Sequence, residues 1–512
     1  MLSTSGLSCG GSATGPAKAR GPATALIVGS GFGGAVTALR LVQRGVRVTL
    51  LEKGRRWPIT PAGDTFSPYI YPDGRSTWLR NLTVVPIGPP LPIRRYVGVL
   101  QGRFFPGMRV LTASAYGGGS IVYGGLLVKP REAFFQEVFS DTIRYSDLLP
   151  YYDRVADMLG IGTVPEDIYR SEYFTHYRVM EEHNRRAGLA TASIESASDW
   201  DIVRAEIRGE IEPSIIHGEA VYGVNSGAKK SLDMSYLADA EATGLLTVHT
   251  LHRATDIEVD KDGRYVVACE RIDETGNILD TPVFRSDILF LAAGSMGTTH
   301  LLVKARARGS LPLLNAEVGQ GWGNNGNVEV LRVAVGAPTG KWQGGPPARA
   351  VADYDNPIAP LFIEHPQLPL GFECRCLLYF GIGVHATRGR FTYDPDTDRA
   401  ILHWPSEGGD QQRVNQALVH TMERLNLANG GRLSPFIGGE KRYMDDACYH
   451  PLGGAVMGKA CDAFGRVRNY PGLYVNDSAL VPGFAGCANP AFTVAALAER
   501  NIERILAEDL GA

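Results

Sequence analysis

Two short motifs near the C-terminus each place one polar side chain directly before a proline. They are Tyr449-His450-Pro451 and Ala488-Asn489-Pro490. Because proline restricts the preceding residue to extended backbone geometry, the imidazole of His450 and the amide of Asn489 are presented stiffly. An imidazole can exchange a proton near neutral pH, and an amide can hydrogen-bond a developing negative charge on oxygen. A lone histidine is more often structural than catalytic, so the motifs alone leave both interpretations open.

A glycine-rich motif near the N-terminus lies between a strand pattern and a helix pattern. The motif Gly29-Ser-Gly31-Phe-Gly33-Gly34 follows the apolar run 25–28 and precedes a helical pattern at 35–45, and the next strand pattern ends at Glu52. This is the context of the dinucleotide fingerprint, in which glycines allow a tight turn, close approach of backbone N–H groups to a diphosphate, and close packing of helix on strand. Glu52 would accept hydrogen bonds from a ribose diol. We predict a βαβ unit that binds a dinucleotide; the alternative is a merely tight turn.

A second glycine-rich run, Tyr116-Gly-Gly-Gly-Ser-Ile-Val-Tyr-Gly-Gly125, lies far from the first in sequence. It is either a flexible hinge or backbone that presses against a flat, extended cofactor ring, where any Cβ would collide. The first motif does not distinguish FAD from NAD, because both use such a cradle. A cofactor that touches both runs favours FAD bound deep in the protein.

Further strand and helix patterns are spread along the chain and must position these motifs. A buried strand pattern at 288–293 leads into Gly294-Ser-Met-Gly297 and a helix, and the chain ends with a strand at 473–475 and an amphipathic helix at 493–506. Segments with the pattern of a nucleotide-binding domain occur at the beginning, middle and end of the chain. We therefore predict a domain that is built from discontinuous pieces. The other expected elements are helices at 131–139, 146–159 and 411–425, strands at 246–259, 265–272 and 283–284, and an irregular, proline-rich segment at 58–92.

The composition is that of a globular protein without a large charge bias. Hydrophobic residues make up 44% of the 512 residues, charged residues 21%, and the formal net charge is −3. These values argue against a disordered chain, a nucleic-acid partner and attraction to an anionic membrane. Seven scattered cysteines include no Cys-x-x-Cys pair, so we expect neither a structural metal site nor a disulfide framework.

The first 24 residues are mostly Gly, Ser, Ala, Thr and Pro, and they lack the apolar core of a signal peptide. We predict a disordered leader at 1–24 and a cytoplasmic protein, with secretion left open. No run of 18 apolar residues occurs, so no membrane span is expected.

Several longer stretches resemble the glucose–methanol–choline (GMC) flavoprotein oxidoreductases, and among them the non-covalent bacterial cholesterol oxidases. These stretches are IVGSGFGGAVTALRL with LLEKG, YGGGSIVYGG, NSGAKKSLDMSYLADA, the run from FLAAGSMGTT to GWGNNGN, the run from CYHPLGGAVMGK to NDSALVPG, and NPAFTVAALAERNIERIL. The resemblance covers nearly everything after Ala25. It thins at 58–114 and 195–218, segments that would cover the substrate.

The resemblance implies roles for individual residues. His450 corresponds to the histidine that hydrogen-bonds the substrate hydroxyl, and Asn489 to the amide beside the flavin and the substrate oxygen. Glu364, in Phe362-Ile363-Glu364, corresponds to the acid/base of cholesterol oxidases. The implied cofactor is FAD. The expected cofactor-binding residues are Gly29, Gly31, Phe32, Gly33, Gly34, Glu52, Gly118, Gly119, Ser120, Tyr123, Gly124, Leu126, Ala254, Asp477, Ser478 and Asn489.

The sequence departs from the family pattern at some of these positions. Tyr123, Leu126 and Ser478 stand where Asn, Met and Gly are usual, and Ala488 is one extra residue before Asn489. We expect backbone contacts to the flavin to survive these changes, whereas the resemblance does not carry over to side-chain contacts from Tyr123 and Leu126.

The fold that the resemblance implies is α/β. A Rossmann-type FAD-binding domain is expected at 25–56, 230–319 and 465–512, and an α+β substrate-binding domain with a large, mostly antiparallel sheet at 57–229 and 320–464. Both domains are thus discontinuous in sequence. The expected partners are a small apolar alcohol and dioxygen, and the expected oligomeric state is a monomer.

The chemistry implied is hydride transfer from a secondary alcohol to the flavin, with dioxygen then reduced to hydrogen peroxide. His450, basic near neutral pH, would orient the hydroxyl and assist removal of its proton. Glu364, a carboxylate among apolar residues, would move a proton to conjugate a double bond with the new ketone. We predict a cholesterol-oxidase-like 3-hydroxysteroid oxidase. The alternatives are a family member that oxidises a non-steroid bulky alcohol in a biosynthetic pathway, as an oxidase or a dehydrogenase, and a flavin-binding protein without turnover.

Overall fold

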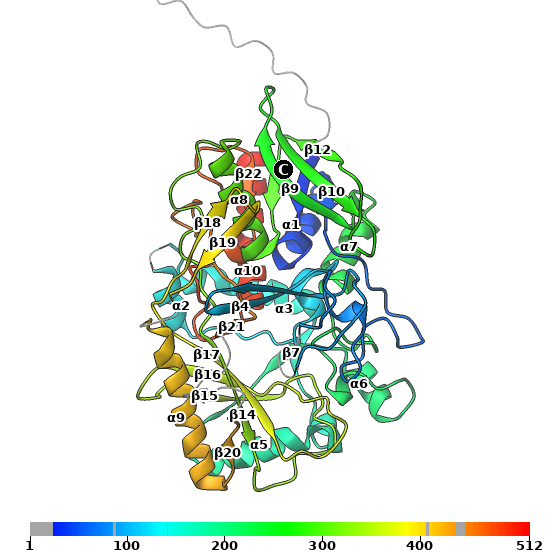
Figure 1. Ribbon diagram of the computed structural model, residues 1–512, viewed down its shortest axis with the longest axis vertical. Coiled ribbons are helices and arrows are strands. Elements are labelled where there is room, and N and C mark those ends of the chain that lie inside the picture. Colours follow the sequence, from blue (N-terminus) through cyan, green and yellow to red (C-terminus); the bar gives the residue numbers. More distant parts are fainter. Residues whose placement is uncertain (1–23, 85–88, 141, 406–408, 436–445, 512) are drawn as a thin grey trace, which may run out of the picture.

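The computed structural model describes residues 24–84, 89–140, 142–405, 409–435 and 446–511. Figure 1 shows a molecule elongated along one axis, with a nucleotide-type α/β part at the end that holds the C-terminus and a second sheet with its own helices at the other end. The predicted leader lies outside the described residues except for Thr24, which begins the first strand. The part of the chain that the structure describes contains no helix that is both long and apolar enough to cross a bilayer.

A five-stranded parallel sheet forms the core of the first part. The first strand, β1, reads Thr-Ala-Leu-Ile-Val, and its last four residues are buried. Near-continuous apolar runs are typical of strands covered on both faces. The strand order is β22 (Leu473–Val475), β13 (Leu289–Leu291), β1 (Thr24–Val28), β2 (Arg47–Leu51) and β8 (Leu246–His249), with all neighbours parallel. As predicted, the sheet draws its strands from the beginning, middle and end of the chain.

Helix α1 (Phe32–Gln43), which follows the first glycine motif, packs against two other helices of this part. Helix α1 contacts α10 (Pro490–Ile505) and α7 (Tyr236–Ala242), and α8 (Gly294–Arg308) follows β13. Helix α10 begins three residues before the predicted start, because Pro490 occupies its first turn and Asn489 is its N-cap. Proline is well suited to that position, since its fixed φ is helical and its missing N–H would be unpaired anyway.

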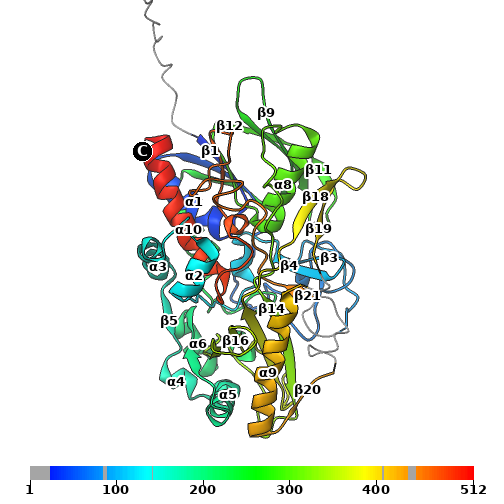
Figure 2. The same cartoon turned by 90° about the vertical axis from the view of Figure 1, so that its left-hand side faces the viewer.

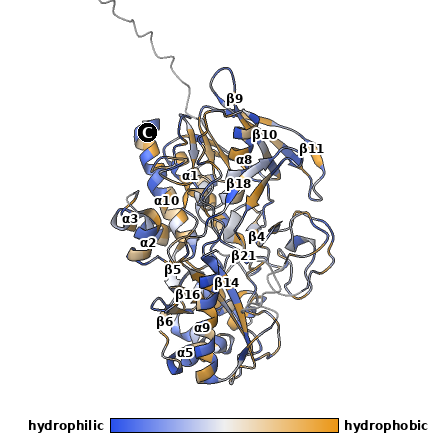
Figure 3. Cartoon of the chain, turned by 60° about the vertical axis from the view of Figure 1, so that its left-hand side comes forward, coloured by the Kyte–Doolittle hydropathy of each residue, from blue (hydrophilic) through white to orange (hydrophobic). Residues whose placement is uncertain are grey.

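An antiparallel six-stranded sheet forms the core of the second part, as the fold prediction required (Figure 2). Helix α9 (Gln411–Asn429) packs against its middle strands, and α5 (Thr175–Arg186) packs against α9 and its other edge. Figure 3 shows α5 and α9 with hydrophilic residues on their outer sides. The strand order is β20 (Arg432–Leu433), β14 (Asn327–Val333), β17 (Leu377–Gly383), β16 (Leu361–Glu364), β15 (Arg349–Asp353) and β6 (Thr191–Ser193).

Smaller elements connect the two parts. The hairpin of β3 (Leu100–Phe105) and β4 (Met108–Ala113) pairs with β21 (Asp446–Cys448) and lies between the two large sheets (Figure 1). The remaining strands are β5 (Ile161–Thr163), β7 (Glu195–Ala197), β9 (His252–Val259), β10 (Tyr265–Ile272), β11 (Ile278–Asp280), β12 (Val283–Ser286), β18 (Arg390–Asp394) and β19 (Arg399–His403). The remaining helices are α2 (Glu132–Phe139), α3 (Tyr145–Leu159), α4 (Glu166–Tyr169) and α6 (Trp200–Ile207). Short 3₁₀ turns are η1 (Gly74–Ser76), η2 (Gly118–Ile121), η3 (Glu172–Phe174), η4 (Ile215–His217), η5 (Leu232–Met234) and η6 (Ser478–Leu480), and a π-helical turn, η7 (Leu506–Leu510), extends α10.

The sequence-based elements match the structure best where apolar periodicity is long. Helices predicted at 146–159 and 411–425 are present as α3 and α9. In the proline-rich segment, the described residues 58–84 and 89–92 contain no helix or named strand apart from η1. The strand expected at 288–293 is shorter, because the chain turns into α8 after Leu291. Helices α4, α5 and α6, which lie within 166–207, have no counterpart among the predicted elements. The predicted domain boundaries stay a prediction; the hairpin β18–β19, placed in the substrate-binding segment, packs against α8.

Candidate active site

One large cavity, of about 1210 Å³, runs between the parallel sheet and the antiparallel sheet. Its wall includes both glycine-rich runs, the carboxyl ends of β1 and β2, the β3–β4 hairpin and residues of β16 and β17. Among the predicted site residues it brings together His450, Asn489 and Glu364. The predicted cofactor-binding residues on the same wall are Gly29, Gly31, Phe32, Gly33, Glu52, Gly118, Gly119, Tyr123, Gly124, Leu126, Ala254, Asp477 and Ser478. Gly34 and Ser120 do not line the cavity.

The first glycine motif is packed tightly on one side and open on the other. A Cβ on Gly33 would lie 1.6 Å from the carbonyl oxygen of Asn476, and a Cβ on Gly34 would lie 2.0 Å from that of Gly29. A Cβ on Gly31 would meet no atom within 4 Å, and Gly31 is the N-cap of α1 without a side-chain cap. The N-terminus of α1 therefore faces open space at Gly31, which is the arrangement that lets a phosphate approach backbone N–H groups.

Glu52 and Ser30 hold this motif in place. The Glu52 carboxylate accepts hydrogen bonds from the Ser30 backbone N–H (3.1 Å), the Ser30 hydroxyl (2.7 Å) and the Gly54 N–H (2.8 Å). A carboxylate has about four acceptor positions, so roughly one is left for a ribose hydroxyl. The Ser30 hydroxyl also accepts a hydrogen bond from Gly117 N–H (3.1 Å), which ties the first glycine motif to the second.

The second glycine run lies directly against the first. A Cβ on Gly118 would lie 2.6 Å from Gly31 Cα, whereas a Cβ on Gly119 would meet nothing within 4 Å. The Lys229 ammonium holds the run from behind, donating to the carbonyl oxygens of Ile121 (2.6 Å) and Tyr123 (2.8 Å). Burial lowers the pKa of Lys229 to about 7. The run is thus fixed backbone on the cavity wall and not a flexible hinge.

The predicted side chains of this run differ in where they point. Tyr123 packs edge-on against Phe32, with ring centroids 5.7 Å apart, and its hydroxyl donates to Lys230 O (3.3 Å). Leu126 packs in a small apolar cluster with Phe362. Ser120 donates to Gly117 O (2.7 Å), so its hydroxyl supports the run internally.

Asp477 and Ser478 hold the start of α8 beside the cavity. Asp477 Oδ2 accepts hydrogen bonds from Gly294 N–H (2.9 Å) and the Thr298 hydroxyl (2.5 Å), and Ser478 Oγ accepts one from Ser295 N–H (2.9 Å). Burial raises the pKa of Asp477 to about 6. Replacement of the usual glycine by Ser478 thus adds a hydrogen bond to the helix start.

His450 is fixed by two asparagines whose amide orientations are determined by backbone groups. Asn327 Oδ1 accepts the Tyr449 N–H (3.0 Å), and Asn325 Oδ1 accepts the Ala485 N–H (2.7 Å). Their Nδ2 groups therefore face His450 Nδ1, at 3.1 Å from Asn327 and 3.4 Å from Asn325. Because amide nitrogens only donate, Nδ1 must accept, and the neutral imidazole carries its proton on Nε2.

The protonation of His450 differs from the sequence-based expectation. Burial lowers the pKa of His450 to about 3, well below the neutral basicity that was expected. At neutral pH the ring is uncharged, and Nε2, which carries the proton, can donate a hydrogen bond but cannot accept a proton.

Glu364 lies on the same cavity wall and is joined to Asn489. Burial raises the pKa of Glu364 to about 8, and a side-chain hydrogen bond from Asn489 partly opposes this shift. Glu364 is 5% exposed, and its Oε1 has no hydrogen-bond partner among the described residues. A carboxyl group with few compensating donors resists ionisation, so Glu364 is a weak acid that exchanges protons near neutral pH.

Strand register places Glu364 near His450. Glu364 pairs with Phe380 across β16 and β17, and the Phe380 ring packs edge-on against the His450 ring at 5.7 Å. Opposite residues on adjacent strands point to the same face. Asn325 completes the connection on the other side, since its Nδ2 also donates to Ala488 O (2.9 Å), next to Asn489.

The residues that position these groups were not predicted from the sequence. Asn325 and Asn327 lie in the GWGNNGN stretch, which was noted only for its resemblance. A row of amides between glycines is a signal for fixed hydrogen bonds, but nothing in it pointed to His450, which is 123 residues from Asn327. The roles of Ser30 and Lys229 were not predicted either, because their contacts with the second glycine run also join segments that are far apart in sequence.

The cavity fits a flavin dinucleotide. An uncapped helix N-terminus opens at Gly31, Glu52 keeps an acceptor position, and the backbone at Gly119 leaves room for a flat ring. No group of three or more His, Cys, Asp or Glu residues in the described ranges could hold a metal ion.

Comparison with known families agrees with this geometry. GMC oxidoreductase models match residues 23–310 and 386–498, and the model of the GMC oxidoreductase C-terminal region matches residues 325–437. The chain belongs to the GMC oxidoreductase family. GMC oxidoreductases are FAD-dependent flavoproteins that oxidise alcohols and related compounds, so FAD is the cofactor of this protein.

Individual relatives share the whole length of the chain at low identity. A cholesterol oxidase of Mycobacterium tuberculosis is 26% identical, with 93% of this chain and 89% of the relative covered. A cholesterol oxidase of Acinetobacter baumannii is 23% identical, with 94% of each chain covered. Two solved structures share the fold. A pyridoxine 4-oxidase from Mesorbium loti has a TM-score of 0.61 and 16% identity, with 94% of this chain and 99% of the other covered. A fungal aryl-alcohol oxidase has a TM-score of 0.66 and 14% identity, with 96% of this chain and 100% of the other covered.

Proposed function

We propose that this GMC oxidoreductase oxidises a 3-hydroxysteroid or a similar bulky secondary alcohol to the ketone, passes the electrons to dioxygen, and shifts a neighbouring double bond into conjugation. The observation that carries the proposal is Glu364, a buried carboxyl with its pKa raised to about 8, on the same cavity wall as His450 and Asn489. Two full-length relatives are named cholesterol oxidases, which supports the substrate class.

His450 and Asn489 bind the alcohol oxygen and do not remove its proton. With its proton on Nε2, His450 donates to the substrate hydroxyl oxygen and orients the carbinol carbon. The amide of Asn489 is hydrogen-bonded to Glu364 and fixes the carboxyl group beside the substrate. Such preorganised donors typically contribute about 10²–10³-fold to a rate.

Glu364 is the base that this site offers. In its ionised form it accepts the hydroxyl proton while the carbinol hydrogen leaves as hydride; bound FAD supplies the hydride acceptor. Because the pKa of Glu364 is about 8, roughly a tenth of the molecules hold it ionised at pH 7. Once Glu364 has released the hydroxyl proton to solvent and is ionised again, the same carboxylate can remove a proton from the carbon next to the new ketone and return it two carbons further along.

A second candidate is a bulky alcohol with a polar group of its own. Glu329 lies on β14 and pairs in register with Phe380 of β17. Its carboxylate accepts a hydrogen bond from the Tyr449 hydroxyl (3.1 Å) and lies 3.8 Å from the Arg109 guanidinium. Glu329 and Tyr449 both line the cavity. An ion pair on the wall of a steroid pocket is unexpected, because an apolar substrate would desolvate it without compensation.

The test is product analysis of the purified holoenzyme with a Δ5-3β-hydroxysteroid in air. We expect hydrogen peroxide and a conjugated enone in equal amounts. Peroxide with a different alcohol but none with the sterol would reject the steroid and leave the second candidate. No peroxide or reduced acceptor with any alcohol would reject the proposal as a whole.

A further inference from the structure

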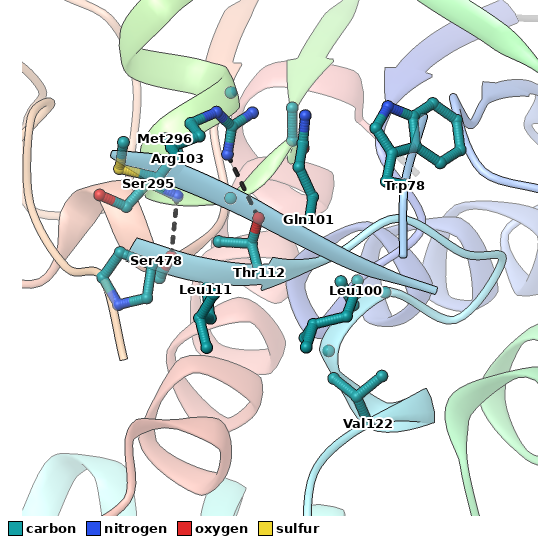
Figure 4. Close-up of a pocket in the computed structure, with 18 of the residues that line it drawn as sticks. Trp78, Leu100, Gln101, Arg103, Leu111, Thr112, Val122, Ser295, Met296 and Ser478 are labelled. Atoms are coloured by element: carbon teal, nitrogen blue, oxygen red, sulfur yellow. Dashed lines mark hydrogen bonds between the residues drawn. The ribbon is translucent and has the colours of Figure 1, made fainter. Parts of the chain in front are cut away.

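The β3–β4 hairpin has two chemically different faces inside the cavity. Cross-strand neighbours Gln101 and Thr112 lie on one face together with Arg103, and Leu100 and Leu111 lie on the other. Figure 4 shows the first three side chains projecting to one side of the hairpin and the two leucines to the opposite side, toward Val122. The hairpin thus separates a polar compartment of the cavity from an apolar one.

The polar compartment contains two cations without a carboxylate partner. Arg103 donates to the Thr112 hydroxyl (3.2 Å), and Lys53 Nζ donates to Gln101 Oε1 (2.5 Å) and lies 5.8 Å from the centre of the Trp78 ring. Neither forms a salt bridge with another described residue, so most of the donors of Arg103 have no acceptor there. Two neighbouring, partly buried cations of the same charge repel each other, and an anion that binds between them would remove this cost.

The electrostatics of the two groups favour the binding of an anion beside them. Burial lowers the pKa of Lys53 to about 7, with repulsion from Arg103 as the next cause and attraction to Glu52 opposing it. Burial also lowers the pKa of Arg103 to about 10. Glu52 cannot neutralise both cations, because one carboxylate carries a single negative charge and this one is turned toward Ser30 and Gly54, from which it accepts three hydrogen bonds.

The position of this pair places it at the cofactor end of the cavity. Lys53 directly follows Glu52 at the carboxyl end of β2, where dinucleotides lie in α/β sheets. The N-terminus of α1 opens into the same cavity at Gly31, whereas the first N–H groups of α8 are occupied by Asp477 and Ser478. A dinucleotide carries its two negative charges on the diphosphate.

We propose that Arg103, with Lys53 beside it, binds the diphosphate of FAD from the hairpin side of the cavity, so that the β3–β4 hairpin is a cationic clamp on the cofactor. The N–H groups of α1 bind the diphosphate from the other side. The clamp rests on FAD as the cofactor and is independent of the identity of the alcohol.

The experiment is a titration of the full-length, deflavinated protein with three probes: FAD, ADP, which keeps the diphosphate, and riboflavin, which lacks it. For Arg103→Gln we expect FAD and ADP to bind about 10- to 100-fold more weakly, the range for lost charge-assisted hydrogen bonds. Riboflavin binding should not change. The dependence of FAD affinity on salt concentration should also become shallower, because one phosphate contact is lost.

Two further variants distinguish the clamp from a general effect of positive charge on the cavity. Arg95→Gln removes the same charge from an exposed side chain on the rim of the cavity and should leave all three affinities unchanged. Arg103→Lys keeps the charge and loses the planar fork, so FAD affinity should fall less and the salt dependence should stay as in the wild type.

Three results would overturn the clamp. The first is an Arg103→Gln protein that binds FAD and ADP with wild-type affinity. The second is an Arg103→Gln protein that loses riboflavin and FAD affinity equally, which would indicate a distorted hairpin. The third is an Arg95→Gln protein that loses as much FAD and ADP affinity as Arg103→Gln. If Arg103→Gln does not fold, a wild-type ADP affinity in Arg103→Lys and in Lys53→Met together would overturn it. No alcohol is used, so a failed steroid assignment and a failed clamp are distinguishable.

Discussion

At the end of the cavity beside the parallel sheet the wall is mostly backbone, whereas at the end beside the antiparallel sheet it is side chains. The backbone wall depends on close approaches such as Gly33 to Asn476 and Gly118 to Gly31. The side-chain wall depends on a few groups with shifted pKa values, His450 and Glu364 above all. We propose that the first end binds the cofactor mainly through the shape of its backbone, with Arg103 and Lys53 adding charge, and that the second end determines the chemistry.

The largest effect is expected from filling the backbone wall. Gly31→Ala places a methyl group in the open space before α1, where the diphosphate must approach, and should give a folded but colourless protein. The flavin-to-protein absorbance ratio and the circular dichroism spectrum measure both properties. Gly162→Ala, whose new Cβ would meet only Trp200 Nε1 at 3.6 Å, is the matched control and should stay yellow. A yellow Gly31→Ala protein would contradict the shape-based account.

Removing the imidazole from the side-chain wall should spare the cofactor and slow the chemistry. We expect His450→Ala to retain FAD and to lose about 10²–10³-fold in the rate of flavin reduction by the true substrate. Stopped-flow absorbance measures that rate. His403→Ala, at an exposed position of β19, controls for the loss of a histidine. Loss of FAD in His450→Ala would mean that the two ends are not separate in function.

The pH dependence of flavin reduction reports on Glu364. Its pKa is raised to about 8, so the ionised base becomes more abundant as the pH rises. The rate should therefore rise about tenfold per pH unit below pH 8 and level off above it. A bell-shaped or flat profile would contradict Glu364 as the base. His450, with its pKa lowered to about 3, should add no second inflection between pH 5 and 9.

A smaller effect is expected from the amide that orients His450. Asn327→Leu removes the nearer of the two amide donors to Nδ1 and leaves the Tyr449 N–H without its acceptor. The preference for the tautomer with its proton on Nε2 then rests on Asn325 alone and is weaker. We expect about a tenfold slower flavin reduction with FAD binding unchanged. Wild-type rates in Asn327→Leu would show that the tautomer does not matter.

The difference between the two ends also explains what could be predicted from the sequence. The glycine motifs and Glu52 were recognised because a tight βα turn needs glycines at fixed spacing, and the parallel sheet followed from apolar runs next to them. Asn325 and Asn327 were not recognised, because their contact with His450 exists only after distant segments meet. The predicted basicity of His450 was wrong for a related reason. The residue type gives only a reference pKa, whereas the burial that lowers the pKa of His450 is a property of the fold.

The central claim, that Glu364 takes the hydroxyl proton of a secondary alcohol beside bound FAD, is tested most directly by a single-turnover measurement. The wild-type holoenzyme and Glu364→Gln, which keeps the size of the side chain and loses its basicity, are mixed without oxygen with a Δ5-3β-hydroxysteroid. The flavin and enone absorbances are followed together. We predict that the wild type bleaches the flavin and forms the enone, and that Glu364→Gln bleaches it about 10²-fold more slowly and forms no enone. Wild-type bleaching and enone formation in Glu364→Gln would contradict the account.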